Sequence, residues 1–369
     1  MNCYKLRDLL QIKNGKDHKE LGEGNIPVFG SGGIMRYADK AIYDEESILL
    51  PRKGTLSNIQ YVNKPFWTVD TIYYTVINQQ LANTFFLYNY LKTLDLSSLD
   101  SGTGVPSMTF NSYYDLKIYL PSLETQQKIA DVLLSLDTKI ELNNRINTEL
   151  EAMAKTLYDY WFVQFDFPDA NGKPYKTSGG KMVYNEALKR EIPEGWSADI
   201  VGNVLGKTPA SNKVLNQEIL LTGSIPVIDQ SKDYICGFTD DKSALIKPTQ
   251  PHIVFGDHTR IVKLVNFEYA RGADGTQVLI SNNKRMPGYL LYQTVAGIDL
   301  SNYGYARHFK FLKDSMIVIP NDAIAARYHG AVTPWFEKIK EGVFENQQLM
   351  LFRDWLLPML MNGQVTVTQ

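Results

Sequence analysis

The chain has 369 residues, of which 44% are hydrophobic and 21% charged, and its formal net charge at pH 7 is −2. This composition is typical of a globular protein with two or more domains and excludes an extended disordered chain. No apolar run reaches the roughly 18 residues of a membrane span, and the first residues lack the apolar segment of a secretion signal. We therefore expect a cytoplasmic protein without membrane contact. Cys3 and Cys236 form no C-x-x-C motif and are expected to be reduced structural thiols.

The charge is unevenly distributed along the chain. Residues 1–120 carry 12 basic and 12 acidic side chains, residues 194–320 carry 13 and 12, and residues 121–161 carry 4 and 7. A free-standing nucleic-acid-binding protein usually has a strong basic excess. A DNA-reading role would therefore need local basic faces, and a partner that supplies further phosphate contacts.

The first 120 residues are predicted to form a mixed α/β domain. Residues 47–51, 59–62 and 71–77 are apolar and β-rich runs bounded by turn residues, which is typical of strands. Residues 81–94 carry apolar side chains at helical spacing and are predicted to form a helix. A further strand is expected over residues 117–121, directly before a much longer helix.

Residues 121–161 show the apolar pattern of a coiled-coil helix about 60 Å long. Apolar residues alternate at spacings of four and three, and Pro121 followed by Ser122 suits a helix start. A long core helix within one large domain is the alternative interpretation. The seam positions are Ile129, Leu133, Leu136, Ile140, Asn143, Asn147, Leu150, Ala154, Leu157 and Trp161. Two asparagines in such a seam cost stability but fix register and partner choice.

A second copy of this arrangement lies 199 residues further along the chain. The strand over residues 117–121 recurs at residues 316–320, and the seam residues Leu150 and Leu157 correspond to Leu349 and Leu356. Near the front of each half, the Ile-Pro-Val of residues 26–28 recurs at residues 225–227. The chain is therefore predicted to be a two-copy repeat of a globular domain followed by a long helix, and not a solenoid.

The second half is predicted from the same kinds of pattern. Strand candidates are residues 199–205, 225–228, 252–255 and 277–280. Pro334 is expected to start a new helix or to kink the second rod, because proline lacks a backbone donor and clashes with the preceding turn. The expected boundaries are a first globular domain over 1–120, a helix over 121–162, an exposed connector over 163–195, a second globular domain over 196–320, a second helix over 321–363 capped by Gly363, and a tail over 364–369.

The sequence contains no complete catalytic motif of the classes considered. An amino-group methyltransferase needs a Pro-Pro turn, and none of the 16 prolines is followed by another. Residues 202–208 have a spacer one residue too short for a phosphate-binding loop. Asp-x-Lys triplets at residues 115–117, 137–139 and 240–242 lack a supporting acidic cluster. The five histidines form no metal-binding pattern. We therefore expect no catalytic residue, no bound metal and no cofactor in this chain.

Polar and basic turns that follow apolar strands are the candidate binding residues. Arginine with small hydroxyl and amide groups is the chemistry that contacts base edges and phosphates. Glycine-rich turns could also approach phosphates through backbone amides, although most such turns only permit positive φ. A solvated loop is the alternative at every one of these positions. The candidates are Ser31, Arg52, Lys53, Thr55, Ser57, Asn58, Thr103 and Ser107 in the first half, and His258, Thr259, Arg260, Arg271 and Arg307 in the second.

Several short segments, in this order on a two-fold repeat, resemble the HsdS-type specificity subunits of Type I restriction–modification systems. The segments are LPSLETQQKI at residues 120–129, YWF at 160–162, FDFP at 165–168, IPEGW at 192–196 and LLPMLMNGQV at 356–365. The resemblance covers essentially the whole chain.

The resemblance implies an α/β (α+β) fold with two target-recognition domains in tandem, separated by two long antiparallel coiled-coil helices with pseudo-two-fold symmetry. Each domain would read one half of a bipartite sequence in double-stranded DNA. The implied partners are two modification (methyltransferase) subunits and ATP-dependent restriction endonuclease subunits, which would hold S-adenosylmethionine, ATP and Mg²⁺. A coiled-coil adaptor whose two globular modules bind proteins is the alternative from another functional class.

Overall fold

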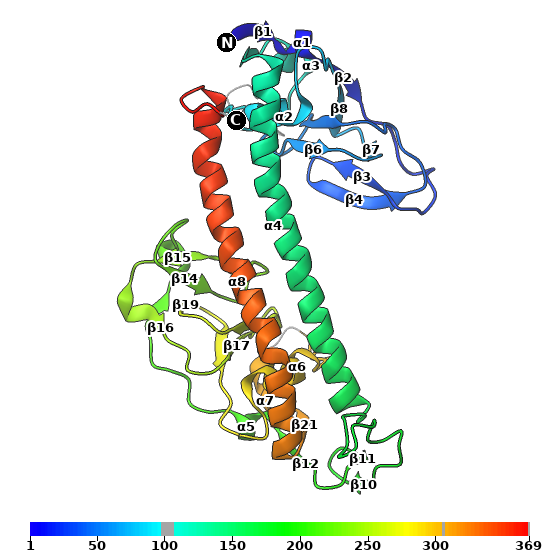
Figure 1. The fold of residues 1–369 in the computed structure, drawn as a ribbon, viewed down its shortest axis with the longest axis vertical. Helices are drawn as coiled ribbons and strands as arrows, with labels where there is room; N and C mark the ends of the chain where they lie inside the picture. Colours follow the sequence, from blue (N-terminus) through cyan, green and yellow to red (C-terminus); the bar gives the residue numbers. More distant parts are fainter. Residues whose placement is uncertain (97–106, 305–306, 368–369) are drawn as a thin grey trace. The chain divides into compact units, whose positions relative to one another are not determined.

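The computed structural model describes residues 1–96, 107–304 and 307–367, and the chain divides into two compact units. The first unit comprises residues 1–142 and 346–369, and the second comprises residues 143–345. Two long helices, α4 (Leu123–Tyr158) and α8 (Asp322–Met361), each contribute a segment to both units (Figure 1). The predicted class, mixed α/β with two globular parts in tandem and two long helices, is confirmed.

The first unit is built from two small sheets with helices beside them. Its globular elements are β1 (Asn2–Lys5), α1 (Leu6–Leu9), β2 (Leu10–Asn14), β3 (Ile26–Gly30), β4 (Gly33–Ala38), β5 (Ser47–Pro51), β6 (Gln60–Val62), β7 (Trp67–Thr68), β8 (Ile72–Ile77), α2 (Thr84–Lys92), α3 (Phe110–Tyr114) and β9 (Lys117–Leu120). The sheet orders are β2-β8-β5-β6 and β4-β3-β7, while β1 pairs antiparallel with β9.

The second unit repeats this plan with additional short elements. Its globular elements are the five-residue π-helical turn η2 (Asp159–Val163), β10 (Met182–Asn185), β11 (Arg190–Pro193), β12 (Ser197–Ile200), α5 (Val201–Val204), β13 (Lys213–Val214), η3 (Asn216–Glu218), β14 (Ile225–Ile228), β15 (Gly237–Thr239), η4 (Lys242–Ala244), β16 (Leu245–Ile246), β17 (His252–Gly256), β18 (Val262–Val265), β19 (Tyr269–Gly272), β20 (Thr276–Leu279), α6 (Gly288–Ala296), α7 (His308–Asp314) and β21 (Met316–Ile319). The sheet orders are β18-β17-β20 and β13-β19-β14-β15, with β16 also on β19.

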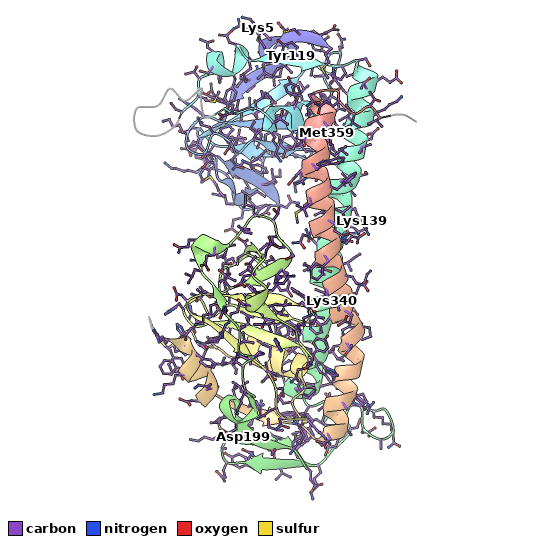
Figure 2. The ribbon with its side chains drawn as sticks, turned by 90° about the vertical axis from the view of Figure 1, so that its left-hand side faces the viewer. Lys5, Tyr119, Lys139, Asp199, Lys340 and Met359 are labelled. Atoms are coloured by element: carbon purple, nitrogen blue, oxygen red, sulfur yellow. The ribbon has the colours of Figure 1, made fainter. Side chains whose placement is uncertain are left out.

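Corresponding elements of the two units follow each other in the same order. The pair β1–β9 of the first unit matches β12–β21 of the second, and in both pairs the later strand leads directly into a long helix. Figure 2 labels Tyr119 on β9 and Asp199 on β12 of these pairs. The central strands β5 and β17 also match, and all five residues of each are buried. The repeat seen in the sequence is therefore a repeat of structure.

The start of α4 is fixed by side chains of the Ser-Leu-Glu-Thr-Gln segment. Ser122 Oγ accepts a hydrogen bond from the Thr125 amide at 3.3 Å, which caps the helix. Gln126 is 1% exposed, and its Nε2 donates to the carbonyl oxygens of Leu81 at 3.0 Å and Pro121 at 3.1 Å. Its Oε1 accepts from the Asn83 amide at 2.9 Å, so Gln126 ties α4 to the start of α2.

Within each unit the α4 segment packs on the α8 segment. In the first unit, Ile129 and Leu133 are in one buried core with Leu356 and Leu360. Arg353 Nη1 also lies 2.7 Å from Asp137 Oδ1. An apolar seam with one charged pair at its edge favours a single register of the two helices.

In the second unit the two helix segments run antiparallel. Asn143 Nδ2 donates to Glu345 Oε2 at 2.8 Å, and further along α4 the Ala154 carbonyl accepts from the Tyr328 hydroxyl at 3.2 Å. Asn143 is 5% exposed, so its buried amide is satisfied across the helices. The remaining predicted seam residues are half-buried: Leu136, Ile140, Asn147, Leu150, Leu157 and Leu349.

Two predictions about individual segments were wrong. Residues 199–205 are not one strand, because β12 ends at Ile200 and residues 201–204 form the helical turn α5. The connector over 163–195 is not exposed throughout, because Phe165 and Phe167 are buried against Trp196. Residues 182–193 of that connector form the β10–β11 hairpin.

Pro334 neither ends nor starts a helix, since α8 is one element from Asp322 to Met361. Pro334 has no N–H to donate to the carbonyl of Gly330, four residues earlier in the helix. Both residues lie on the exposed face of α8, where water can donate to that carbonyl instead. Val332 and Phe336 on either side are buried and hold the helix by packing. Gly363 follows the helix with φ of 75°, the left-handed conformation typical of a helix C-terminus.

The α4–α8 seam of the first unit yields a stability prediction. Leu133 is fully buried and its neighbour Leu134 is 43% exposed. L133A removes buried methyl groups and leaves a cavity, so we expect the free energy of unfolding to fall by about 2–5 kcal/mol. L134A is the matched control and should change it by less than about 0.5 kcal/mol. Urea unfolding of the two variants measures the difference, and equal losses would contradict the seam.

Candidate functional site

In the first unit, three loops meet beyond the ends of β3, β5 and β7. They are the turn at Ser31, the loop 52–58 and the turn at residues 70–71. The Arg52 amide donates to the Thr71 carbonyl at 3.0 Å, and Asn58 Nδ2 donates to the Ser31 carbonyl at 2.6 Å. The candidates Ser31, Arg52 and Asn58, which are far apart in sequence, are thus held together by hydrogen bonds.

The guanidinium group of Arg52 is held at the surface of this loop cluster. Its Nη1 donates to the Asp70 carbonyl at 3.4 Å, and its central carbon lies 5.9 Å from the centroid of the Tyr73 ring. Burial raises the pKa of Tyr73, and the charge of Arg52 partly opposes that rise. Arg52 is half-exposed, so its remaining donors face solvent.

The second unit contains the same three loops, held by the same backbone hydrogen bonds. The Asp257 amide donates to the Gly275 carbonyl at 2.7 Å, as the Arg52 amide does to the Thr71 carbonyl. The His308 amide donates to the Asp257 carbonyl at 3.0 Å, as the Met108 amide does to the Arg52 carbonyl at 3.0 Å. The two loop clusters are therefore structural equivalents.

This equivalence corrects one detail of the predicted site. Arg52 and Arg260 do not occupy the same position, because the backbone hydrogen bonds match Arg52 with Asp257. Arg260 lies three residues later, at a φ of 62° that non-glycine residues seldom adopt. Its Nη1 donates to the Leu300 carbonyl at 3.3 Å, at a cavity that Asp299 also lines.

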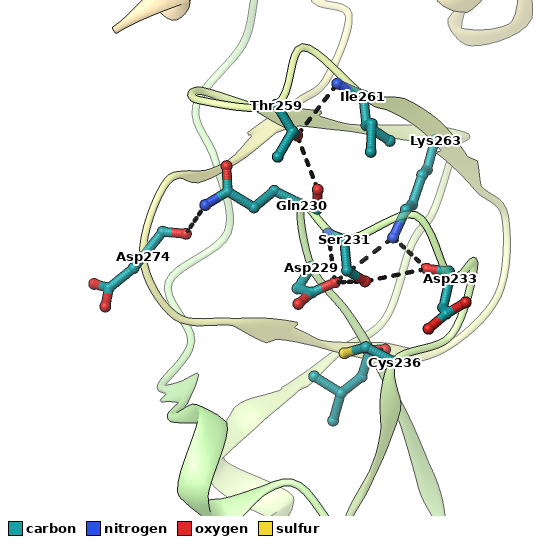
Figure 3. A network of polar contacts seen from close by, with 10 residues as sticks. Asp229, Gln230, Ser231, Asp233, Cys236, Thr259, Ile261, Lys263 and Asp274 are labelled. Carbon is teal, nitrogen blue, oxygen red and sulfur yellow. Dashed lines mark hydrogen bonds and ion pairs between the residues drawn. The ribbon is translucent and has the colours of Figure 1, made fainter. Parts of the chain in front are cut away.

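Gln230, which is not among the residues predicted from the sequence, joins the three loops of the second unit (Figure 3). Its backbone carbonyl accepts from Thr259 Oγ1 at 2.8 Å, and its Nε2 donates to the Asp274 carbonyl at 3.0 Å. Its Oε1 accepts from the His258 amide at 3.3 Å. A spacing of 199 residues matches Gln230 with Ser31, so extending the repeat past residues 225–227 could have found it.

Glycine is required where these loops approach each other. A side chain at Gly275 (φ 67°) would place a Cβ 2.7 Å from Gln230 Nε2 and 2.8 Å from His258 Cδ2. A side chain at Gly256 would place one 2.1 Å from Thr259 Oγ1. The loop cluster is therefore tightly packed, which fixes where His258, Thr259 and Arg260 emerge.

A largely buried ion pair includes Asp229, the residue before Gln230. Lys263 and Asp229 have side chains 5% and 16% exposed, and Lys263 Nζ lies 3.6 Å from Asp229 Oδ1. Burial lowers the pKa of Lys263, and the carboxylate only partly opposes this. Burial acts to raise the pKa of Asp229, but hydrogen bonds from Ser231 and the charge of Lys263 outweigh it and hold that pKa below its usual value.

The other candidate residues are distributed around the two clusters. Lys53, Thr55 and Ser57 are exposed on the 52–58 loop, and Lys53 forms an isolated β-bridge with half-buried Ser107. Arg307 is exposed directly before α7, and Arg271 is half-buried on β19. Thr103 lies outside the described residues.

Within residues 1–96, 107–304 and 307–367, no His, Cys, Asp and Glu side chains form a group of three or more that could hold a metal ion. In the same described part of the chain, no helix is both long and apolar enough to cross a lipid bilayer.

Comparison with known proteins places this geometry in a family context. A family model described as the Type I restriction modification DNA specificity domain matches residues 1–152. The chain is similar to the Type I restriction enzyme MjaIX specificity subunit of Methanocaldococcus jannaschii, with 24% identity over 99% of this chain and 93% of that subunit. It is also similar to the HindI specificity subunit of Haemophilus influenzae, with 26% identity over 72% of each. Among solved structures, the S subunit of a Type-I restriction-modification system from M. genitalium shares the fold, with a TM-score of 0.66 and 16% identity over 97% of this chain and 95% of that one.

Proposed function

Because the chain belongs to the Type I restriction–modification DNA specificity subunits, we propose that it selects a bipartite, asymmetric DNA sequence for its partner subunits. The observation that carries this proposal is the recurrence of one three-loop cluster in both units, with equivalent backbone hydrogen bonds and different side chains. Two similar surfaces with different exposed groups suit two half-sites of different sequence.

Each loop cluster carries side chains of the types that contact DNA base edges and phosphates. Arginine donates bidentately to guanine, and serine, threonine, asparagine and lysine bond to base edges or phosphates. The first cluster presents Arg52, Lys53 and Asn58, and the second presents His258, Thr259 and Arg260. These are the residues that we assign to DNA contact.

The proposal includes a complex with modification and restriction subunits in a cytoplasmic setting. The near-neutral globular parts suit such a complex, because partner subunits would supply the additional phosphate contacts. Two modification subunits would match the two units of this chain. S-adenosylmethionine, ATP and Mg²⁺ would be bound by the partners, and this chain would be non-catalytic. Family membership argues against the alternative of a protein-binding adaptor.

Methylation mapping tests the proposed function. The purified chain should neither methylate nor cut DNA, since its sequence has no Pro-Pro turn to hold a target amino group and its Asp-x-Lys triplets lack a supporting acidic cluster. Coexpressed with its modification partner, it should direct adenine methylation to one asymmetric bipartite sequence, which single-molecule sequencing detects. Robust methyl transfer by the isolated chain, or a complex that methylates without sequence preference, would contradict the proposal.

The two loop arginines give a sharper prediction. If Arg52 or Arg260 reads a guanine, R52A or R260A should weaken binding by about 1–3 kcal/mol and relax one position of one half-site. If the arginine contacts only phosphate, binding should weaken evenly across sequences and the salt slope should fall by about one unit. The measurement is duplex titration of the assembled complex at several salt concentrations. Unchanged affinity and specificity would assign that arginine to a solvated loop.

A further inference from the structure

One strand position carries a long polar side chain in both units. Gln60 on β6 pairs with Leu49, the third residue of buried strand β5, and Lys263 on β18 pairs with Val254, the third residue of buried strand β17. Gln60 and Lys263 are therefore structural equivalents. Both are long polar side chains next to the central strand; Lys263 is 5% exposed and Gln60 is half-buried.

Lys263 contacts the loop that carries Gln230 (Figure 3). Its Nζ donates to the Asp233 carbonyl at 2.5 Å and forms the ion pair with Asp229. Asp229 Oδ1 in turn accepts from the Ser231 amide at 2.9 Å and the Ser231 hydroxyl at 2.5 Å. One buried ammonium thus fixes residues 229–233, and Gln230 extends from this segment to the other two loops.

Gln60 holds the equivalent loop of the first unit by a neutral contact. Its Nε2 donates to the Gly30 carbonyl at 3.3 Å, and Gly30 is the residue that matches Asp229 at the 199-residue spacing. The next residue, Ser31, accepts the hydrogen bond from Asn58. The same support therefore uses an amide in one unit and a buried ammonium in the other.

We propose that Gln60 and Lys263 are positioning residues for DNA specificity, each holding the loop cluster that reads one half-site. This inference rests on the proposed function. Neither side chain needs to touch DNA, because each acts through the loop above it. Removing either should therefore relax one half-site while leaving the other half-site, and assembly with the partner subunits, unchanged.

The chemistry of the two contacts predicts how each variant acts. K263M leaves the Asp229 carboxylate in a largely buried place without its counter-ion, a costly arrangement that the 229–233 loop can relieve by moving. Q60M keeps the length of the side chain but leaves the Gly30 carbonyl without its donor. D229N removes the charge of the carboxylate with a minimal change of shape and leaves the buried Lys263 ammonium without its counter-ion, so it should affect the same half-site as K263M.

The experiment uses the complex of the full chain with its modification subunits. Methylation mapping of the unchanged complex first defines the bipartite sequence. Duplexes with that sequence, and duplexes in which one half is altered, are then compared for each variant. We expect K263M to lower discrimination at one half-site by roughly tenfold, the size of one mismatched base pair, and Q60M to do the same at the opposite half-site. K232M is the control, since Lys232 is an exposed lysine in the same loop.

The outcomes separate this inference from the proposed function. If K263M does not assemble, D229N replaces it and should relax the same half-site. Wild-type specificity in Q60M and in the variant of the ion pair, loss at the same half-site in both, or an equal loss in K232M would overturn the inference and leave the proposed function intact. Absence of any bipartite sequence with the unchanged complex would overturn both.

Discussion

Each loop cluster depends on a five-residue strand that is buried along its whole length. Strands β5 and β17 lie between two neighbours in their sheets, and no residue of either strand is exposed. A shift of register by one residue would misplace every side chain of such a strand, so its position is strongly specified. The residue that follows each strand, Arg52 or Asp257, is then fixed by a backbone hydrogen bond to the turn before β8 or β20. The loops need not be rigid by themselves, because the buried strand places them.

The two units keep this backbone and differ in the side chains placed on it. The first unit joins its loops through Asn58 and Ser31, and the second joins them through Thr259 and Gln230. The side chain that holds the loop is the neutral amide of Gln60 in the first unit and the charged ammonium of Lys263 in the second. Such an arrangement allows the exposed groups to change while the strand and the backbone hydrogen bonds remain. That separation of scaffold from readout would let two units with the same backbone plan read two different half-sites.

The elements that the sequence predicts well are those with a strong local pattern. Strand β5 was predicted to the residue, because an unbroken apolar run is bounded by polar residues and a proline. The strand expected over residues 199–205 was wrong, because Ile200, Val201, Val204 and Leu205 are spaced as on one face of a helix and do not alternate as in a strand. Of the two effects expected of Pro334, the start of a new helix was wrong, because α8 continues through this residue. The kink stays a prediction.

The loops of the candidate site could be predicted from glycine and basic residues, but their supports could not. A lysine or glutamine in a strand is normally solvated, so Lys263 and Gln60 resemble surface residues in the sequence. Their roles depend on partners about 30 residues away, which only the folded chain brings together, and for Lys263 also on burial.

The central claim is that each unit reads one half-site independently of the other. Replacing residues 197–320 with the matching segment of a related specificity subunit exchanges the second loop cluster and leaves residues 1–120 and both long helices unchanged. Methylation mapping of the chimera beside the parent tests the claim directly. The account predicts that one half of the recognised sequence changes, while the other half and the spacer between them stay the same. If both halves change in a chimera that assembles and methylates, the two units do not read independently and the account is wrong.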